Sequence, residues 1–195
     1  NGIAQSFLIA EDFIQKENVC LILGDNVFHG IGQPKISKEG ATIFAYEVNE
    51  PTAYGVVEFD KNGLAISIEE KPTIPKSNFA IPGLYFYDKN VVEYSKSLKP
   101  SSRGELEITD LNKIYLDKKD LNVIKFPRGS AWLDAGTPDS LLDSANFIQT
   151  IEKRQGLKIA CLEEVAYKNG FISLKSLKKL AENYKKGSEY RKYLD

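Results

Sequence analysis

The stretch that decides the fold is Val19-Cys20-Leu21-Ile22-Leu23-Gly24-Asp25-Asn26. Its five consecutive apolar residues, followed by a Gly-Asp pair, predict a strand buried on both faces, which is typical of parallel sheets. A helix is predicted just before it, because apolar residues recur at helical spacing, at Ile3, Phe7, Ala10 and Ile14. In an open α/β sheet, ligands bind beyond the carboxyl ends of the strands. We therefore expect Asp25 to lie at the mouth of a binding site.

Asp25 has two interpretations at this stage. A bare carboxylate at a strand end, next to a glycine that lets the chain approach a ligand, is suited to a hard cation or to a sugar hydroxyl. Alternatively, Asp25 begins a turn or caps a helix. The stretch by itself favours neither interpretation.

A second stretch repeats this pattern. In Ala131-Trp132-Leu133-Asp134-Ala135-Gly136-Thr137-Pro138, an apolar strand is followed by an aspartate and small residues. Thr137 as the N-cap and Pro138 at the first helical position predict the start of a helix. Asp25 and Asp134 could then converge on one divalent cation. Mg²⁺ usually takes one or two protein carboxylates together with phosphate oxygens and water, so the pair suggests an enzyme that handles phosphates.

The composition narrows the class of protein. The 195 residues include 26 Lys and Arg and 27 Asp and Glu, a balance that does not favour nucleic acid or an anionic membrane as partner. The apolar runs are too short to span a bilayer, and no secretory signal is visible. Cys20 and Cys161 lack metal-ligand spacing, so we expect both to be reduced core residues of a cytoplasmic protein. His29 is the only histidine, so a site built on several histidines is not expected.

The chain is predicted to form an α/β body over residues 1–161 and a helical appendage over residues 162–195. Strands are expected at 41–48, 80–87 and 121–126, and helices at 91–98 and 107–116. The segments 54–59 and 64–69 alternate at period two around Asp60-Lys61-Asn62-Gly63, which predicts a hairpin. Pro82 predicts a bulge or an end position in its strand.

Two further groups of charged residues are placed where they could line the same crevice. Glu70 and Lys71 follow a strand, and a Lys suits a phosphate while a Glu accepts hydrogen bonds from sugar hydroxyls. An adjacent Glu-Lys pair is, however, more often a solvated surface ion pair. Arg103 lies in a loop before a helix and could clamp a phosphate, although the neighbouring carboxylates could simply favour the helix N-terminus. Considered singly, both groups favour the purely structural interpretation.

Seven blocks occur in order along the chain, at residues 23–26 (LGDN), 54–60 (YGVVEFD), 69–72 (EEKP), 75–78 (PKSN), 83–88 (GLYFYD), 103–110 (RGELEITD) and 132–137 (WLDAGT). Each block alone is weakly specific, but seven in order are highly specific. Together they resemble the sugar-phosphate nucleotidyltransferases, most closely the branch that transfers a thymidylyl group to glucose 1-phosphate. The resemblance runs from residue 2 to about residue 170 and fades in the last helices.

The resemblance implies a fold, a reaction and partners. The fold is α/β: a Rossmann-like nucleotidyltransferase three-layer sandwich with a mixed sheet, followed by C-terminal helices. The reaction joins dTTP and glucose 1-phosphate, releases pyrophosphate and gives dTDP-glucose for the dTDP-L-rhamnose pathway, with Mg²⁺ as cofactor. The macromolecular partners are further copies of the chain, in a homotetramer.

The resemblance also implies roles for residues. It assigns Asp25 and Asp134 to Mg²⁺ and Gly2 to the nucleotide base. It assigns the glucosyl group and other substrate contacts to Asn26, Tyr54, Gly55, Glu70, Ile81 and Tyr85. It assigns the sugar phosphate to Lys71 and Arg103, so that Lys71, Arg103 and Asp25 carry catalysis. Because the sugar phosphate oxygen is itself the nucleophile, positioning and charge neutralisation replace a Ser, Cys or His nucleophile.

One feature of the family is absent from this sequence. Its Gly-Gly-X-Gly-Thr-Arg-Leu loop, which holds the triphosphate through backbone N–H groups, would lie N-terminal to residue 1. We therefore expect this chain to be inactive alone. The alternatives are a non-catalytic subunit that binds sugar phosphates and a related uridylyl- or adenylyltransferase, since base choice depends largely on the absent region.

Overall fold

The structure is a computed structural model that describes residues 2–195. The chain divides into two compact units, of which the first ends at Gly136 and the second runs from Thr137 to Asp195. The strands, all in the first unit, are β1 (Val19–Ile22), β2 (Asn26–His29), β3 (Ala41–Glu47), β4 (Gly55–Phe59), β5 (Ala65–Glu70), β6 (Phe79–Ala80), β7 (Leu84–Tyr87), β8 (Leu121–Lys125) and β9 (Ala131–Asp134). Its helices are α1 (Gln5–Ile9), α2 (Glu11–Ile14), the 3-10 helix η1 (Pro51–Ala53), α3 (Val91–Ser97) and α4 (Ile108–Asp117). The second unit contains α5 (Pro138–Gln155), α6 (Leu162–Lys168), α7 (Leu174–Ala181) and α8 (Glu189–Leu194).

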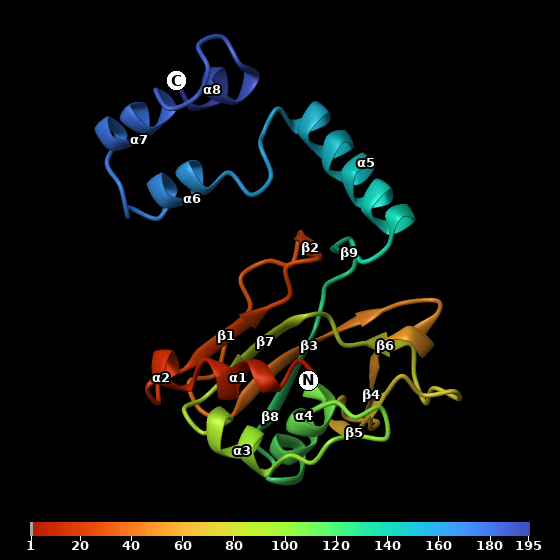
Figure 1. The fold of residues 1–195 in the computed structure, drawn as a ribbon. Coiled ribbons are helices and arrows are strands. Elements are labelled where there is room, and N and C mark those ends of the chain that lie inside the picture. The colour runs from red at the N-terminus through yellow and green to blue at the C-terminus, as the bar shows by residue number, and fades with distance from the viewer. Residues whose placement is uncertain (1) are drawn as a thin grey trace. The chain divides into compact units, whose positions relative to one another are not determined.

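The first unit is built on a mixed sheet of seven strands. Their order is β1-β7-β3-β6-β4-β5, and β8 also pairs with β3 (Figure 1). The central β3 is antiparallel to β6 and β7 and parallel to β8. A separate antiparallel ribbon of β2 and β9 pairs Asn26 with Asp134. The chain therefore has the expected mixed α/β architecture.

β1 differs from its prediction. Within residues 2–195 it lies at the sheet edge, pairs only with β7 and is antiparallel to it. Its side chains alternate between partly buried and exposed, so that Cys20 is exposed and Ile22 is 56% exposed. A continuous apolar strand is buried on both sides only where other elements cover both of its faces. Within residues 2–195, only one face of β1 is covered. The predictions of two-sided burial and of Cys20 as a core residue are therefore wrong for this chain, whereas Cys161 is free and buried as predicted.

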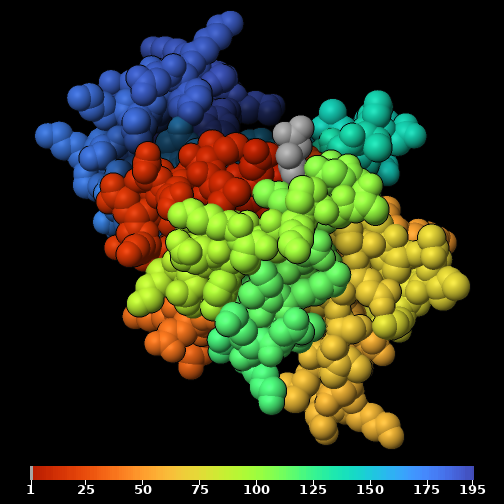
Figure 2. All heavy atoms as spheres, turned by 60° about the horizontal axis from the view of Figure 1, so that its bottom comes forward, coloured from red at the N-terminus to blue at the C-terminus, as the bar shows by residue number. Residues whose placement is uncertain are grey.

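Helices α1 to α4 cover one face of the sheet. The apolar faces of these helices meet inward-pointing sheet residues in one core, to which Phe7, Ile43, Tyr85, Val91 and Leu111 belong. Figure 2 shows the outer surface of this layer, where α1 and α2 in red, α3 in yellow-green and α4 in green lie side by side. The helices predicted before β1 and after residues 90 and 107 are thus present, the first as two short helices.

Aromatic side chains attach the β2–β9 ribbon to the opposite face of the sheet. Phe44 follows the inward-pointing Ile43 and therefore points to the other face. Its ring centroid lies 5.1 Å from that of Phe126, which lies 6.0 Å from that of Phe28 in β2. Tyr46 and Trp132 of β9 are 5.8 Å apart. These contacts hold the ribbon, and with it Asp134, against the sheet.

The predicted turns are confirmed. Asp60 closes the β4–β5 hairpin, because its Oδ1 accepts hydrogen bonds of 2.8 Å from the backbone N–H groups of Asn62 and Leu64. Gly63 has a φ of +82°, which favours glycine. The strand predicted at 80–87 is interrupted around Pro82, since β6 ends at Ala80 and β7 begins at Leu84.

The second unit begins with the predicted helix start. Thr137 is the N-cap of α5 and forms a capping box with Ser140, and Pro138 occupies the first turn. We expected the α/β body to extend to residue 161, whereas the two compact units divide after Gly136, so that α5 is grouped with the C-terminal helices. Leu141 and Leu142 of α5 are exposed. The apolar residues of this helix therefore did not indicate which of the two units it belongs to. Among residues 2–195, no helix is both long and apolar enough to cross a membrane.

Candidate functional site

A cavity of about 300 Å³ lies in the first unit. It collects side chains from the β1–β2 connection, β5, β9 and the loop before α4. The candidate site residues that line it are Asp25, Asn26, Tyr54, Gly55, Glu70, Lys71, Ile81, Tyr85, Arg103 and Asp134. The structure thus brings together every residue that the sequence singled out except Gly2.

Gly2 has a structural reason to be glycine. Its φ is +109°, and a Cβ at this position would lie 2.5 Å from the carbonyl oxygen of Leu106. Backbone contact continues at Ala4, whose N–H donates to the same carbonyl at 3.2 Å. Gly2 therefore allows the N-terminal segment to pack against the loop that carries Arg103.

The carboxylates of Asp25 and Asp134 converge. Oδ1 of Asp25 accepts a hydrogen bond of 2.7 Å from Asn26 Nδ2. Oδ1 of Asp134 accepts a hydrogen bond of 3.4 Å from the Tyr54 hydroxyl. Neither Oδ2 accepts a hydrogen bond from any residue in the range 2–195. Both Oδ2 atoms lie near the same point, since a Cβ built on Gly136 would lie 3.7 Å from the first and 3.8 Å from the second.

This donor set fits Mg²⁺ bound together with phosphates. Two free carboxylate oxygens are what Mg²⁺ uses when a substrate phosphate and water supply its other ligands. The described part of the chain holds no cluster of three or more His, Cys, Asp or Glu side chains that could bind a metal alone. The pair lies at one end of the antiparallel β2–β9 ribbon, not at the ends of parallel strands as predicted.

Asn26 connects the Asp25 carboxylate to the body of the fold. Its Oδ1 accepts hydrogen bonds from the indole Nε1 of Trp132 at 2.7 Å and from the backbone N–H of Gly83 at 3.0 Å. Its Nδ2 is used by Asp25. Both polar atoms of the Asn26 side chain therefore take part in hydrogen bonds, which hold the side chain in place. Because it is held, Asn26 can orient the Asp25 carboxylate.

Glu70 is held in the part of the cavity wall that β4 and β5 form. Oε2 of Glu70 accepts a hydrogen bond of 2.5 Å from the hydroxyl of the buried Thr109. Gly55 pairs with Glu70 across the β4–β5 ladder, and a Cβ on Gly55 would lie 3.1 Å from Thr109 Oγ1 and 3.6 Å from Ile81 Cδ1. The absence of a side chain at Gly55 therefore keeps this wall open.

Lys71 has a strained backbone. Its φ is +42°, in the left-handed region that non-glycine residues rarely adopt. Its N–H donates to the carbonyl of Tyr54 at 3.0 Å, which fixes the chain direction at the end of β5. Strain of this kind gathers at functional sites, where it aims a side chain.

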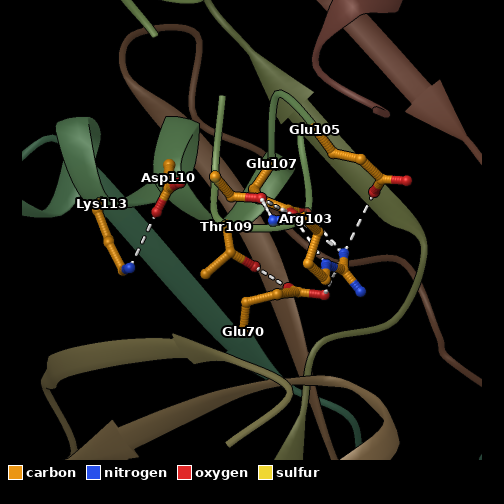
Figure 3. A network of polar contacts seen from close by, with 8 residues as sticks. Glu70, Arg103, Glu105, Glu107, Thr109, Asp110 and Lys113 are labelled. Atoms are coloured by element: carbon orange, nitrogen blue, oxygen red, sulfur yellow. Dashed lines mark hydrogen bonds and ion pairs between the residues drawn. The ribbon is translucent and has the colours of Figure 1, made fainter. Parts of the chain in front are cut away.

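Arg103 is surrounded by carboxylates (Figure 3). Its Nε and Nη2 donate to the Glu107 carboxylate at 3.0 to 3.1 Å. Glu105 lies 3.3 Å and Glu70 3.8 Å from Nη2. The hydrogen bond to Glu107 raises the pKa of Arg103 further above its usual range. The arginine is thus a fixed cation.

Two tyrosines of the cavity stay protonated at neutral pH. Burial raises the pKa of Tyr85, and the negative charge of Glu70 adds to the effect. Partial burial also raises the pKa of Tyr54, with a further contribution from Asp134. Both hydroxyls can therefore donate hydrogen bonds.

The cavity is acidic overall. Five carboxylates line it, from Asp25, Glu70, Glu105, Glu107 and Asp134, against the two cations Lys71 and Arg103. A phosphorylated ligand would be repelled by this excess of negative charge unless a cation accompanied it. Sequence reasoning missed the contributions of Glu107, Thr109 and Trp132, although all three lie within the motif blocks. Thr109 and Trp132 act through hydrogen bonds to Glu70 and Asn26 in other segments, for which the sequence has no local signal. Glu107 bonds to Arg103 and Ser101 of its own loop.

The family model described as "Nucleotidyl transferase" matches residues 1–151. The glucose-1-phosphate thymidylyltransferase of Neisseria meningitidis serogroup A is 52% identical over 200 residues, covering 100% of this chain and 69% of that protein. The enzyme of that name from Mycobacterium tuberculosis H37Rv is 50% identical over 199 residues, with the same coverage.

Solved structures agree with these matches. A Bacillus anthracis protein assigned as a glucose-1-phosphate thymidylyltransferase, in complex with sucrose, has a TM-score of 0.66 at 40% identity. The match covers 75% of this chain and 61% of that chain, so the chain spans less than two thirds of that structure. A UDP-glucose pyrophosphorylase complexed with UDP-glucose shares the fold at 21% identity, with a TM-score of 0.67 over 76% of this chain and 62% of that one. The predicted Rossmann-like nucleotidyltransferase fold is confirmed.

Proposed function

Since the chain belongs to the nucleotidyl transferase family of enzymes, and within it to the glucose-1-phosphate thymidylyltransferases, we propose that its cavity binds glucose 1-phosphate. The whole protein then joins glucose 1-phosphate to dTTP, giving dTDP-glucose and pyrophosphate. The observation that carries the proposal is the convergence of the two free Oδ2 atoms of Asp25 and Asp134 beside Lys71 and Arg103.

The residues of the cavity divide the work of this reaction. A phosphate oxygen of glucose 1-phosphate attacks the α-phosphorus of dTTP, a new P–O bond forms, and the bond to pyrophosphate breaks. Lys71 and Arg103 bind the sugar phosphate and orient its oxygen. Glu70 accepts hydrogen bonds from the sugar hydroxyls. Asp25 and Asp134 would hold Mg²⁺, which supplies neutralisation of the phosphate charge when bound.

The finer parts of the proposal rest on the family resemblance. We propose Mg²⁺ as the cofactor, a cytoplasmic location, where both substrates are made, and a homotetramer. We also propose that the product serves dTDP-L-rhamnose synthesis.

Pyrophosphate release tests the proposal. The 195-residue chain, alone and joined to the N-terminal segment of the Neisseria meningitidis relative, would be assayed with Mg²⁺, glucose 1-phosphate and each nucleoside triphosphate in turn. We expect activity with dTTP in the joined protein. Asp134→Asn should lower this activity at least about 100-fold, because the metal that would neutralise the charge of the transition state is lost. Asp143→Asn, at an exposed position of α5, is the control.

The outcomes separate the alternatives. Activity with UTP or ATP in place of dTTP would identify a related transferase. Binding of glucose 1-phosphate without pyrophosphate release in either protein would support the non-catalytic subunit.

A further inference from the structure

We propose that Glu107 is a positioning residue that holds the guanidinium of Arg103 so that its Nη1 edge faces the sugar phosphate. This inference rests on the proposed function. It assigns a role to a carboxylate that the reaction itself does not use.

The geometry of Glu107 is that of a fixed support. Its side chain is only 8% exposed, although it lines a polar cavity. Oε1 accepts hydrogen bonds from Arg103 Nε at 3.1 Å and from Ser101 Oγ at 2.7 Å, and Oε2 accepts from Arg103 Nη2 at 3.0 Å. A carboxylate with both oxygens engaged and little exposure cannot easily reorient, so it fixes the plane of the guanidinium.

Glu107 is not used as a helix cap. It occupies the N-cap position of α4, but its side chain makes no capping hydrogen bond. A Glu at this position that instead turns to an arginine forgoes the favourable interaction with the helix N-terminus. The position of Glu107 therefore serves its contact with Arg103 and not the capping of α4.

The pairing leaves one edge of Arg103 available. An arginine has five N–H donors in a rigid fork, and Glu107 uses those on Nε and Nη2. Nη1 donates to none of the residues in the range 2–195, and the arginine side chain is 43% exposed. A preorganised cation loses less side-chain freedom when it binds a phosphate, so the support should raise the affinity for glucose 1-phosphate.

Glu105 is a natural comparison. It also contacts Nη2 of Arg103, at 3.3 Å, but its side chain is 44% exposed and it makes one contact where Glu107 makes three. The two residues carry the same charge and lie in the same cavity. A pure charge effect would make them equivalent, whereas a positioning effect belongs to Glu107 alone.

Binding of glucose 1-phosphate, followed by ³¹P NMR on the full 195-residue chain, tests the inference. We expect Glu107→Gln to weaken binding about tenfold, because a charge-assisted hydrogen-bond pair is lost, and Glu105→Gln to weaken it less than about twofold. In a double-mutant cycle, Glu107→Gln should cause no further loss in an Arg103→Ala background. A merely structural role would weaken binding equally in both backgrounds.

Other results overturn the inference. Unchanged or tighter binding in Glu107→Gln would show that Glu107 only neutralises Arg103. If Glu107→Gln does not fold, as judged by circular dichroism, Ser101→Ala replaces it in the same cycle, with an expected loss of about threefold from one missing hydrogen bond. A wild-type chain that binds no glucose 1-phosphate would refute the proposed function itself, and this inference with it.

Discussion

The indole Nε1 of Trp132 donates a hydrogen bond of 2.7 Å to Oδ1 of Asn26. These residues are 106 positions apart, and the bond joins the two strands of the ribbon. Because Asn26 in turn donates to Asp25, the indole acts on the Asp25 carboxylate, a proposed metal ligand, without touching it. Orientation of a ligand by such an outer partner is a common feature of metal sites.

Trp132→Phe should therefore weaken divalent-cation binding. The phenyl ring keeps most of the packing but loses the N–H, so Asn26 keeps only the donor of Gly83. We expect the affinity for Mn²⁺ with dTTP, measured by electron paramagnetic resonance in the protein joined to the N-terminal segment of the relative, to fall several-fold, and the free energy of unfolding to fall by about 1 kcal/mol. Tyr46→Phe is the control, because its hydroxyl donates to Ser130 in the same region and not to Asn26. An equal loss in both variants would contradict the prediction.

Lys71→Gly should raise the stability of the fold while it weakens the binding of glucose 1-phosphate. A left-handed residue with a side chain is less stable than glycine by up to about 1 kcal/mol, so the free energy of unfolding should rise in urea denaturation. Binding of glucose 1-phosphate should fall about tenfold, because the amine is lost. Lys119, with a φ of +63°, is the matched control: Lys119→Gly should give the same stabilisation with unchanged binding. Destabilisation by Lys71→Gly alone would show that the Lys71 side chain supports the fold.

The sequence predicted local features well and tertiary ones unevenly. The hairpin at Asp60 and the helix start at Thr137 are encoded by adjacent residues, and both are confirmed. β1 was misjudged because a run of apolar residues has no signal for how many faces its neighbours cover. The carboxylates near Arg103 were noted in the sequence, but the pairing of Glu107 with the arginine and not with the helix depends on Ser101 and the loop conformation. The separate ribbon that brings Asp134 to Asp25 depends on aromatic contacts between distant segments.

The two cysteines should differ in reactivity. Cys20 is exposed on β1 and Cys161 is 1% exposed. We expect Ellman's reagent to label one thiol rapidly in the native 195-residue chain and both after denaturation. Partial desolvation raises the pKa of the Cys20 thiol, so the rate should increase steadily above neutral pH as thiolate forms. The variant Cys20→Ser should lack the rapid phase. Rapid labelling of two thiols in the native chain would show that the second unit opens readily.

The second unit should lose stability in acid through Glu163. Its carboxylate accepts hydrogen bonds from the hydroxyls of Tyr184 and, at 2.8 Å, Tyr190, and the bond from Tyr184 is the main cause of its lowered pKa. A lowered folded-state pKa means that the stabilisation is present above the usual value near 4.5 and is lost as the pH falls through the folded value.

Amide hydrogen exchange of α6 to α8 between pH 5 and pH 3, with rates corrected for intrinsic exchange, measures this loss. The protection of these helices should fall with acid in the wild type and fall less in Glu163→Gln. Some acid dependence should persist, because Glu164 also has a lowered pKa, chiefly through its contact with Lys168. Glu182→Gln, at an exposed position, is the control and should follow the wild type. An identical acid dependence in Glu163→Gln and the wild type would mean that the tyrosine contacts do not stabilise the helices.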